Sequence, residues 1–445
     1  MMGVFKNIKI ESTILILLTL SIFISFSLDL STYNYIENFN NNPKNKYLKE
    51  FFTNITELGD SVWYFSICIL CILIFFVNKR TNLITTNSPD KIFNFFISAF
   101  VYLLVVGIIT QVIKHIIGRP RPNYTNFNDV FNFNFLSFDS TLHSFPSGHS
   151  STVFIVCLII GVVLPKLKYF FYFLATIVAL SRVVVGAHFF TDVVAGFLLA
   201  LIIFKILNNI IDKNFKNYSL SKIEFNSNSR LYYFVIFLIS NSLFFTVGPS
   251  IDLYISSLFY YGNSQFYIQS FDYLSIIFRE VLLPILLIYI LILPILNRYI
   301  NIKKIFFNYN FSLREICLIW FSQIFTLLLF VNLILKNLWG RARPGDVFEF
   351  NGTELFTNWF EYSTACNTNC SFVSGDASVG FSIIILYLIT KKIVFVNLSI
   401  VFGSLLGIVR IMEGGHFLSD IIFAGLIIIL LNLIIYKVYK KYYDY

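Results

Sequence analysis

Long apolar runs separated by short polar segments recur along the whole chain of 445 residues. A helix that crosses a bilayer needs about 20 apolar residues, and on that criterion the sequence holds about twelve candidate spans. Backbone polar groups need partners inside lipid, and these runs do not alternate as barrel strands do, so the pattern predicts an all-α integral membrane protein. The candidate spans lie near residues 13–30, 61–77, 93–113, 150–165, 169–187, 189–208, 231–247, 276–296, 316–335, 376–390, 393–409 and 417–436.

The first apolar run follows Lys6 and Lys9 and therefore resembles a signal peptide. No small-residue cleavage site follows it, because the run ends in Ser-Leu-Asp-Leu. We interpret the run as a retained first helix. A cleaved signal would remove one span and break the symmetry described next.

An internal repeat divides the chain into two halves. The segment Lys114–Pro122, which reads Lys-His-Ile-Ile-Gly-Arg-Pro-Arg-Pro, recurs as Lys336–Pro344, which reads Lys-Asn-Leu-Trp-Gly-Arg-Ala-Arg-Pro. Other polar residues recur in the same order about 225 residues downstream, which indicates a duplication. The pairs are Asp29 with Asp252, Ser147 with Ser374, Gly148 with Gly375, Arg182 with Arg410, His188 with His416, and Asp192 with Asp420.

Each half holds about six candidate spans, and an even number returns the chain to the same side of the membrane. The sequence therefore predicts two tandem six-helix bundles of the same orientation, related by an axis along the membrane normal. Residues 1–208 are the expected first unit and residues 230–445 the second. Residues 209–229 are rich in Asn, Lys and Ser, as a cytoplasmic linker would be.

The formal net charge of +9 does not indicate nucleic-acid binding, because it follows the membrane topology. With the N-terminus in the cytoplasm, most Lys and Arg fall on the inner side, which is the bias that orients membrane proteins. Both termini are then cytoplasmic. Six cations fall instead at the outer ends of the spans, where topology does not explain them: Lys114, Arg121, Arg182, Lys336, Arg343 and Arg410.

Three of these outer cations, Lys114, Arg121 and Arg182, occur in the first half. Charges at a membrane are costly and usually functional, and three cations that converge need an anion such as a phosphate group. Ser147 and Gly148 open the fourth span, and a helix start offers free N–H groups that bind anions. All these points lie at the extracytoplasmic ends of their helices. We therefore expect an outward-facing phosphate site.

Two histidines supply the candidate chemistry of this site. His188 and Asp192 are four residues apart, so they share a helical face, and the carboxylate can hold the imidazole in one tautomer. This arrangement makes His188 a candidate nucleophile. His149 follows Gly148 at the helix start and can donate a proton to a leaving oxygen.

Three motifs of the first half resemble the signature of the type 2 phosphatidic acid phosphatase (PAP2) superfamily, which also includes vanadium haloperoxidases. The resemblance covers both halves and implies six-helix bundles with a phosphatase activity that needs no metal or cofactor. It implies that three cations bind phosphate, that His188 attacks phosphorus while Asp192 orients it, and that His149 protonates the leaving group. The motifs are Lys114-x6-Arg121-Pro122, Pro146-Ser147-Gly148-His149 and Ser181-Arg182-x5-His188-x3-Asp192.

The second half keeps most of the signature but departs from it at the general acid. Asp376 stands where the first half has His149, and it follows Ser374 and Gly375. An aspartate is ionised at neutral pH and is a poor proton donor. Either this site binds phosphate without efficient turnover, or its substrate has a leaving group that needs little protonation. The matching positions are Lys336, Arg343, Arg410, His416 and Asp420.

The segment Phe372–Ser378 favours an active second site, because it resembles a variant found in bacterial relatives near the lipid A phosphatases. The expected activity is hydrolysis of a lipid phosphate or pyrophosphate at the outer face of the cytoplasmic membrane of a bacterium, and lipid A is one candidate. Undecaprenyl pyrophosphate, phosphatidylglycerophosphate and phosphatidic acid are alternatives. A lipid-phosphate binding or transport protein without catalysis is a further alternative. Haloperoxidase chemistry is disfavoured, since it needs bound vanadate and the spans favour a lipid substrate.

The cysteines add one open question. Cys366 and Cys370 fall in a predicted extracytoplasmic loop, where a disulfide could persist. No histidine or second cysteine pair is near them in the sequence, which disfavours a zinc site.

Overall fold

The computed structural model describes residues 25–81, 89–124, 132–220, 230–268, 272–300 and 309–443. Helices dominate these residues, and the two strands named among them form one short antiparallel hairpin of β1 (Tyr260–Gly262) and β2 (Gln265–Phe266). The chain divides into two compact units, Met1–Tyr233 and Phe234–Tyr445. The all-α prediction is confirmed. The unit boundaries expected at residues 208 and 230 stay predictions, because residues 221–229 lie outside the described part.

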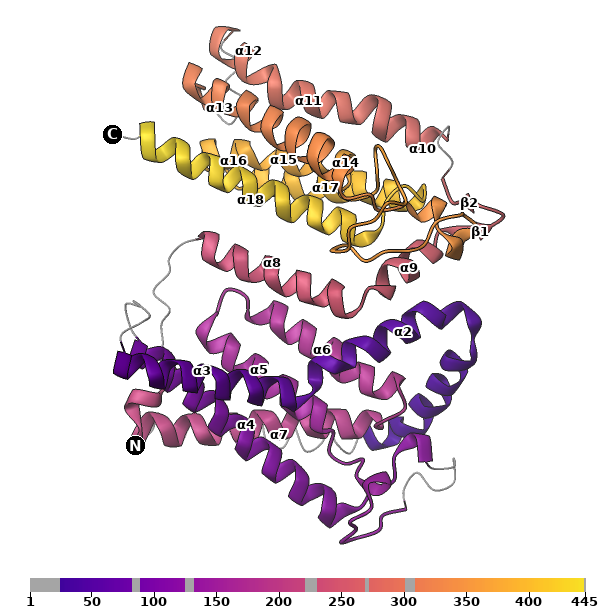
Figure 1. The fold of residues 1–445 in the computed structure, drawn as a ribbon, viewed down its shortest axis with the longest axis vertical. Helices are drawn as coiled ribbons and strands as arrows, with labels where there is room; N and C mark the ends of the chain where they lie inside the picture. Colours follow the sequence, from indigo (N-terminus) through magenta and orange to yellow (C-terminus); the bar gives the residue numbers. More distant parts are fainter. Residues whose placement is uncertain are drawn as a thin grey trace. The chain divides into compact units, whose positions relative to one another are not determined.

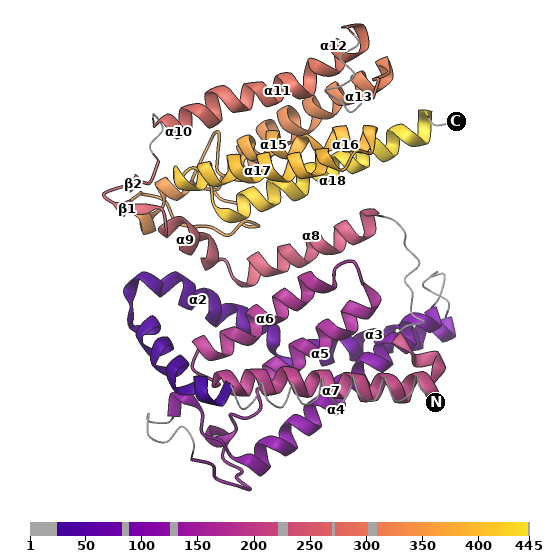
Figure 2. The ribbon, with the colours of Figure 1, turned by 180° about the vertical axis from the view of Figure 1, so that it is seen from behind.

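The first unit begins with a helix over residues 25–41. Figure 1 shows the helices that follow, with α5, α6 and α7 side by side, and Figure 2 shows the same arrangement from behind. These three helices bring together the polar residues that the repeat singles out. The helices are α2 (Lys46–Ile55), α3 (Ser61–Thr81), α4 (Pro89–Ile117), α5 (Gly148–Val163), α6 (Lys168–Val184) and α7 (Phe190–Asn214), with a 3-10 turn at Thr56–Gly59.

The second unit repeats this order after a bent helix pair. In this unit α15 packs against α17 and α18, as α5 packs against α6 and α7 in the first. Two stretches are π-helical, Ile277–Leu282 and Ile324–Leu335. The helices are α8 (Arg230–Val247), α9 (Ser250–Ser257), α10 (Tyr273–Ile276), α11 (Leu283–Leu291), α12 (Leu293–Ile300), α13 (Leu313–Gln323), α14 (Lys336–Leu338), α15 (Gly375–Ser382), α16 (Ile384–Thr390), α17 (Val394–Met412) and α18 (Leu418–Tyr443).

A glycine ends the helix that carries the first cation of each repeat. Gly118 has a φ of +57° and follows α4, and a Cβ there would lie 1.7 Å from the carbonyl oxygen of Asn134. Gly340 has a φ of +70°, and a Cβ there would lie 1.6 Å from the carbonyl oxygen of Ser363. Only glycine tolerates both the left-handed backbone and this approach. The sharp turn lets the following Arg-x-Arg-Pro segment fold back over the end of the helix.

Fewer helices in the described part of the chain meet the criterion for a membrane span than the sequence pattern predicts. Among the described residues, seven helices are long and apolar enough to cross a membrane, or eight if the pair bent by 79° between Val247 and Ser250 counts as one span. The expected count of about twelve is therefore not confirmed. Part of the difference lies in Gly148–Val163 and Gly375–Thr390, which are apolar but shorter than a full span. Most of the expected first span, 13–30, lies outside the described residues.

Candidate active site

Six of the predicted site residues line one cavity of about 270 Å³ in the first unit. They come from the end of α4, the segment after it, the start of α5, the end of α6 and the segment before α7, so residues far apart in sequence converge. Ser147 and Asp192 lie behind this lining, and the amide of Ser147 donates to the carbonyl of Asp192 at 2.9 Å. The six lining residues are Lys114, Arg121, Gly148, His149, Arg182 and His188.

Some donor atoms of the cations in this cavity have no hydrogen-bond partner among the described residues. The Nε atoms of Arg121 and Arg182 are buried and have no partner within the described part of the chain. Lys114 donates one hydrogen bond, to the carbonyl of His143 at 2.8 Å, and Arg182 donates to the hydroxyl of Thr56 at 2.9 Å. Buried guanidinium donors without partners are costly, so the arrangement favours an anion with several oxygen acceptors.

The start of α5 adds backbone donors to the same cavity. Ser147 caps the helix through its side chain, which accepts from the amide of Ser150. The first amides of a helix have no partner within the helix, and they carry the positive end of its dipole. Since Gly148 and His149 line the cavity, these donors and the three cations point to one phosphate-sized anion.

His188 is held in the tautomer that a nucleophile needs. Its ring is almost fully buried, and Nδ1 lies 2.7 Å from the carbonyl oxygen of Ser144. A carbonyl only accepts, so Nδ1 carries the proton in this contact and Nε2 of the neutral ring keeps its lone pair. Burial lowers the pKa of His188 from 6.5 to about 3. The imidazole is therefore neutral at physiological pH and lines the cationic cavity.

Asp192 reaches His188 less directly than the four-residue spacing predicts. Its Oδ2 atom lies 3.7 Å from Nδ1 of His188, which is longer than a hydrogen bond. The same oxygen accepts from the hydroxyl of Ser144 at 2.5 Å and from the amide of Phe189 at 2.8 Å. Any orientation of the imidazole by Asp192 therefore runs through Ser144, whose carbonyl receives the Nδ1 proton.

Arg119 is a site residue that the motif analysis missed. It is fully buried and donates to Asp192 and to Asp29, each at 2.7 Å. Asp29 also accepts from the amide of Thr191 at the start of α7, at 2.9 Å. The sequence held a signal for this network, because the repeat carries Arg119 to Arg341 and Asp29 to Asp252. In the sequence these matches indicate a duplication, and nothing in the pattern suggests a chemical role for them.

The second unit builds the same buried network from its own residues. Arg341 donates to Asp420 at 2.6 Å and to Asp252 at 2.9 Å. The hydroxyl of Ser371 donates to Asp420 at 2.5 Å, as Ser144 does to Asp192. Burial lowers the pKa of His416 from 6.5 to about 4, and its Nδ1 atom lies 3.7 Å from Asp420. Among the described residues Nδ1 has no hydrogen-bond partner, which distinguishes His416 from His188.

The cations of the second unit are bound by protein groups. Arg410 pairs with Glu413, and its Nε atom lies 3.4 Å from a carboxylate oxygen of Asp376. Lys336 donates to the side chain of Asn369 at 3.0 Å, and Arg343 donates to the carbonyl of the same asparagine at 2.7 Å. The three predicted cations of the second unit therefore contact carboxylate, amide and carbonyl oxygens of the protein, although Nε of Arg410, like Nε of Arg182, has no hydrogen-bond partner among the described residues.

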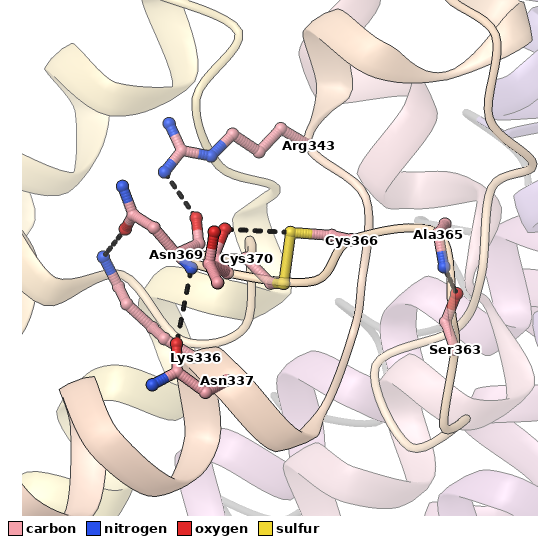
Figure 3. Close-up of a disulfide and its surroundings, with 9 residues drawn as sticks. Lys336, Asn337, Arg343, Ser363, Ala365, Cys366, Asn369 and Cys370 are labelled. Atoms are coloured by element: carbon pink, nitrogen blue, oxygen red, sulfur yellow. Dashed lines mark hydrogen bonds between the residues drawn. A yellow bond between two sulfur atoms is a disulfide. The ribbon is translucent and has the colours of Figure 1, made fainter.

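A disulfide between Cys366 and Cys370 closes the loop that carries Asn369 (Figure 3). The amide of Cys370 donates to the carbonyl of Lys336 at 3.0 Å, so the loop is tied to the start of α14. The open question about these cysteines is thus answered in the structure. The cross-link lies directly beside two of the predicted phosphate-binding cations.

A cavity of about 430 Å³ adjoins the second site. Lys336, Gly375 and Asp376 line one part of it, and Ser374 caps the helix that carries the last two, as Ser147 does in the first unit. Apolar side chains of α11 and of the Ile324–Leu335 helix line the rest. The lining is therefore more apolar than that of the first cavity.

Apolar helices bring a buried histidine, three cations and the start of a helix to one cavity, an arrangement that fits an integral-membrane phosphatase. The model of the PAP2 superfamily matches residues 95–216 and 317–444. The chain therefore belongs to the PAP2 superfamily, in two tandem copies, and it is a phosphoric ester hydrolase. The predicted family, repeat and enzyme class are confirmed.

Two curated relatives and one solved structure are similar to the chain. It is 33% identical over 207 residues to the lipid A 4'-phosphatase of Francisella tularensis subsp. novicida, covering 45% of this chain and 91% of that protein. It is 34% identical over 154 residues to the lipid A 1-phosphatase of Rhizobium etli, covering 34% of this chain and 65% of that protein. The crystal structure of a PAP2-type phosphatidylglycerolphosphate phosphatase from Bacillus subtilis has 24% identity and a TM-score of 0.32, and the match covers 45% of this chain and 96% of that one.

Proposed function

We propose that the chain hydrolyses a lipid phosphate or pyrophosphate through a phospho-histidine intermediate, at the extracytoplasmic face of a bacterial cytoplasmic membrane. Lipid A is the substrate that the relatives favour, because the two curated relatives described above are named lipid A phosphatases. One observation carries the catalytic part of the proposal. The unprotonated nitrogen of the buried, neutral His188 belongs to a side chain that lines the same cavity as three cations.

In the proposed first step, the phosphate group occupies the first cavity. Lys114, Arg121 and Arg182 bind its oxygens, and the amides at the start of α5 bind the charge that develops in the transition state. Nε2 of His188 attacks phosphorus and forms a P–N bond. The bond between phosphorus and the leaving oxygen breaks, and the electron pair leaves with that oxygen.

His149 completes the proposed cycle in the first unit. Burial, and then the nearby Arg182, lower the pKa of His149 to about 4. A bound phosphate dianion raises this pKa, and the protonated His149 then gives a proton to the leaving oxygen, so the lipid departs as a neutral alcohol. The neutral His149 then takes a proton from water, and the resulting hydroxide attacks phosphorus. This second displacement breaks the P–N bond and releases inorganic phosphate with His188 restored.

The proposed membrane orientation follows from charge and from the disulfide. Placing both termini in the cytoplasm puts most Lys and Arg on the inner side, as membrane insertion favours. Cys366 and Cys370 then face the extracytoplasmic side, where disulfides persist. Both sites lie at that same end of their helices in this orientation, and membrane lipids with an outward headgroup are the expected partners.

Three rival readings follow from the same family and the same site. Undecaprenyl pyrophosphate and phosphatidylglycerophosphate present the same phosphate chemistry on other lipids. A lipid-phosphate binding or transport protein would use the cations alone, and it would not need the oriented imidazole of His188. The histidine therefore separates catalysis from binding.

The test uses the purified wild type, His188→Ala, His416→Ala and the double variant on a panel of lipid phosphates in detergent. We expect the double variant to release no phosphate above background, and His416→Ala to retain hydrolysis by the first site. Equal phosphate release by all four proteins would overturn the proposed nucleophiles. Retained lipid binding with no turnover by the wild type on any substrate of the panel would favour a binding protein.

A further inference from the structure

The two units differ in charge at the position of the proposed proton donor. His149 and Asp376 are each the second residue of a helix that begins with a glycine after a capping serine. In the first unit, His149 shares its cavity with the carboxylate of Asp60. In the second unit, Asp376 accepts a hydrogen bond from Arg279 at 3.2 Å. The histidine beside a carboxylate is thus replaced by a carboxylate beside a guanidinium.

Two carboxylates hold Arg279 against the second site. Besides Asp376, it pairs with Glu413, whose carboxylate lies 3.8 Å from Nη1 of Arg279. Glu413 is almost fully buried and lies three residues before His416, whereas the first unit has Val185 three residues before His188. Arg279 itself lies on the π-helical turn Ile277–Leu282, and such turns often occur at functional sites. Arg279 and the Glu413 that pairs with it therefore occur together in the second unit.

Asp376 contacts two guanidinium groups. One of its oxygens lies 3.2 Å from Nε of Arg279 and 3.4 Å from Nε of Arg410. Arg279 supplies a fixed positive charge at this place, and such a charge stabilises a leaving oxygen that departs as an anion.

We propose that the second site is specialised for leaving groups that depart as stabilised anions, and that Arg279 replaces the general acid there. This inference rests on the proposed phosphatase function and names the substrate class of its second site. His416 forms the P–N bond, the bond to the leaving oxygen breaks, and the electron pair stays on that oxygen without a proton from the protein. Lipid diphosphates and acylated sugars with an anomeric phosphate share this chemistry. Simple alkyl phosphates have no such leaving group, and we expect the first site to hydrolyse them.

The experiment isolates each site within the full chain. His188→Ala leaves only the second site, and His416→Ala leaves only the first. Each protein is assayed in detergent with p-nitrophenyl phosphate, phenyl phosphate, a short-chain phosphatidic acid, a prenyl diphosphate and an acylated glucosamine 1-phosphate. The last two substrates distinguish the two sources of a stabilised leaving group. We expect the preference for p-nitrophenyl over phenyl phosphate to be at least about tenfold larger at the second site, because general acid catalysis supplies about 10²–10⁴-fold for poor leaving groups.

Reciprocal substitutions provide matched controls. In the His188→Ala chain, Asp376→His should raise the rate on phosphatidic acid about tenfold or more and reduce the preference for p-nitrophenyl phosphate. In the His416→Ala chain, His149→Asp should lower the rate on phosphatidic acid about 10²-fold or more and reduce the rate on the diphosphate much less. Arg279→Gln should lower the second-site rate on the diphosphate about 10²-fold, and Arg279→Lys should restore part of it. Thermal unfolding of each variant separates these effects from misfolding.

The outcomes separate this inference from the proposed function. Two outcomes would overturn this inference but not the proposed phosphatase function. One is an equal leaving-group preference at the two sites. The other is no turnover of any substrate by the His188→Ala chain while the His416→Ala chain stays active. A second-site rate that Arg279→Gln does not change would also overturn it. If neither isolated site nor the wild type turns over any substrate, the proposed phosphatase function itself fails.

Discussion

The guanidinium of Arg119 lies 2.7 Å from the carboxylate of Asp192, and neither side chain is exposed to solvent. The second unit repeats this pair, with Arg341 at 2.6 Å from Asp420. In each unit the arginine also binds an aspartate near the start of the unit, Asp29 or Asp252. Asp192 thereby bears a fixed counter-charge, and it holds Ser144, whose carbonyl orients the proposed nucleophile.

Arg119→Gln should impair the first site without removing any cation of the cavity. Removing one partner of a buried ion pair costs about 3–5 kcal/mol, so we expect the apparent melting temperature in detergent to fall by about 10 °C. If the variant folds, loss of the precise His188 position should lower kcat about 10²-fold in the His416→Ala chain, with KM little changed. Steady-state kinetics on a lipid phosphate and a thermal unfolding scan measure the two effects.

The equivalent substitution in the other unit is the control for this prediction. Arg341→Gln in the same His416→Ala chain should leave the first-site rate within about twofold, because the two networks share no residues. Arg119→Lys, which keeps a charge but cannot bridge two carboxylates, should fall between the wild type and Arg119→Gln. A normal kcat for a folded Arg119→Gln protein would show that the network is structural only.

The sequence was sufficient for the helical class, the duplication and the cationic cavity, because each leaves a local pattern. Apolar runs predict helices, and motif residues at a fixed spacing, such as Arg182-x5-His188, can be recognised directly in the sequence. The Asp29–Arg119–Asp192 network was not predictable in the same way. Its members are far apart in sequence, and Arg119 stands two residues before Arg121 in the motif, so the sequence does not distinguish it from a phosphate-binding arginine. In the structure its side chain donates to Asp192.

The span count and the second site show two further limits of sequence reasoning. A hydropathy run does not show where a helix bends, so the break of 79° after Val247 was not expected. Sequence comparison revealed Asp376 in place of the proton donor. It could not reveal Arg279 beside it, because Arg279 belongs to a helix that carries no motif, and only the fold places it 3.2 Å from Asp376.

The protonation state of His188 can be measured directly. Burial lowers the pKa of this histidine from 6.5 to about 3, so the folded protein should keep it neutral as pH falls through 6.5. In nitrogen-15 NMR spectra of the phosphate-free His416→Ala chain, we expect His188 to remain the Nδ1–H tautomer from pH 8 to about pH 5. The same spectrum of the chain with His188→Ala added assigns the signal. A midpoint near 6.5, or an Nε2–H tautomer, would contradict the assigned hydrogen bond to Ser144.

A chelator should leave the rate of the first site unchanged. Three positive side chains, Lys114, Arg121 and Arg182, supply the charge that a divalent metal supplies in other phosphatases, and they would repel such a cation. We expect the His416→Ala chain to keep its full rate on a lipid phosphate after dialysis against EDTA. Added magnesium should not raise the rate, after correction for its binding to the substrate. Loss of turnover in EDTA that magnesium restores would show that the mechanism is metal-dependent.

The disulfide should matter to the second site alone. Asn369 lies between Cys366 and Cys370 and binds both Lys336 and Arg343, so the cross-link fixes the partner of two proposed phosphate-binding cations (Figure 3). In the His188→Ala chain, we expect Cys366→Ser with Cys370→Ser to raise KM about tenfold, or about 1.4 kcal/mol, with a smaller change in kcat. Dithiothreitol should produce the same change in the unsubstituted loop.

Two controls make this last prediction specific. Cys317→Ser removes an exposed free cysteine of the same unit and should change neither constant. The double cysteine variant in the His416→Ala chain should keep first-site kinetics, because the first cavity belongs to the first unit and the loop 366–370 to the second. An unchanged second-site KM in the double variant would mean that Asn369 holds its position without the cross-link. A fall in KM would mean that the loop competes with phosphate for Lys336 and Arg343, and that the disulfide restrains turnover at the second site.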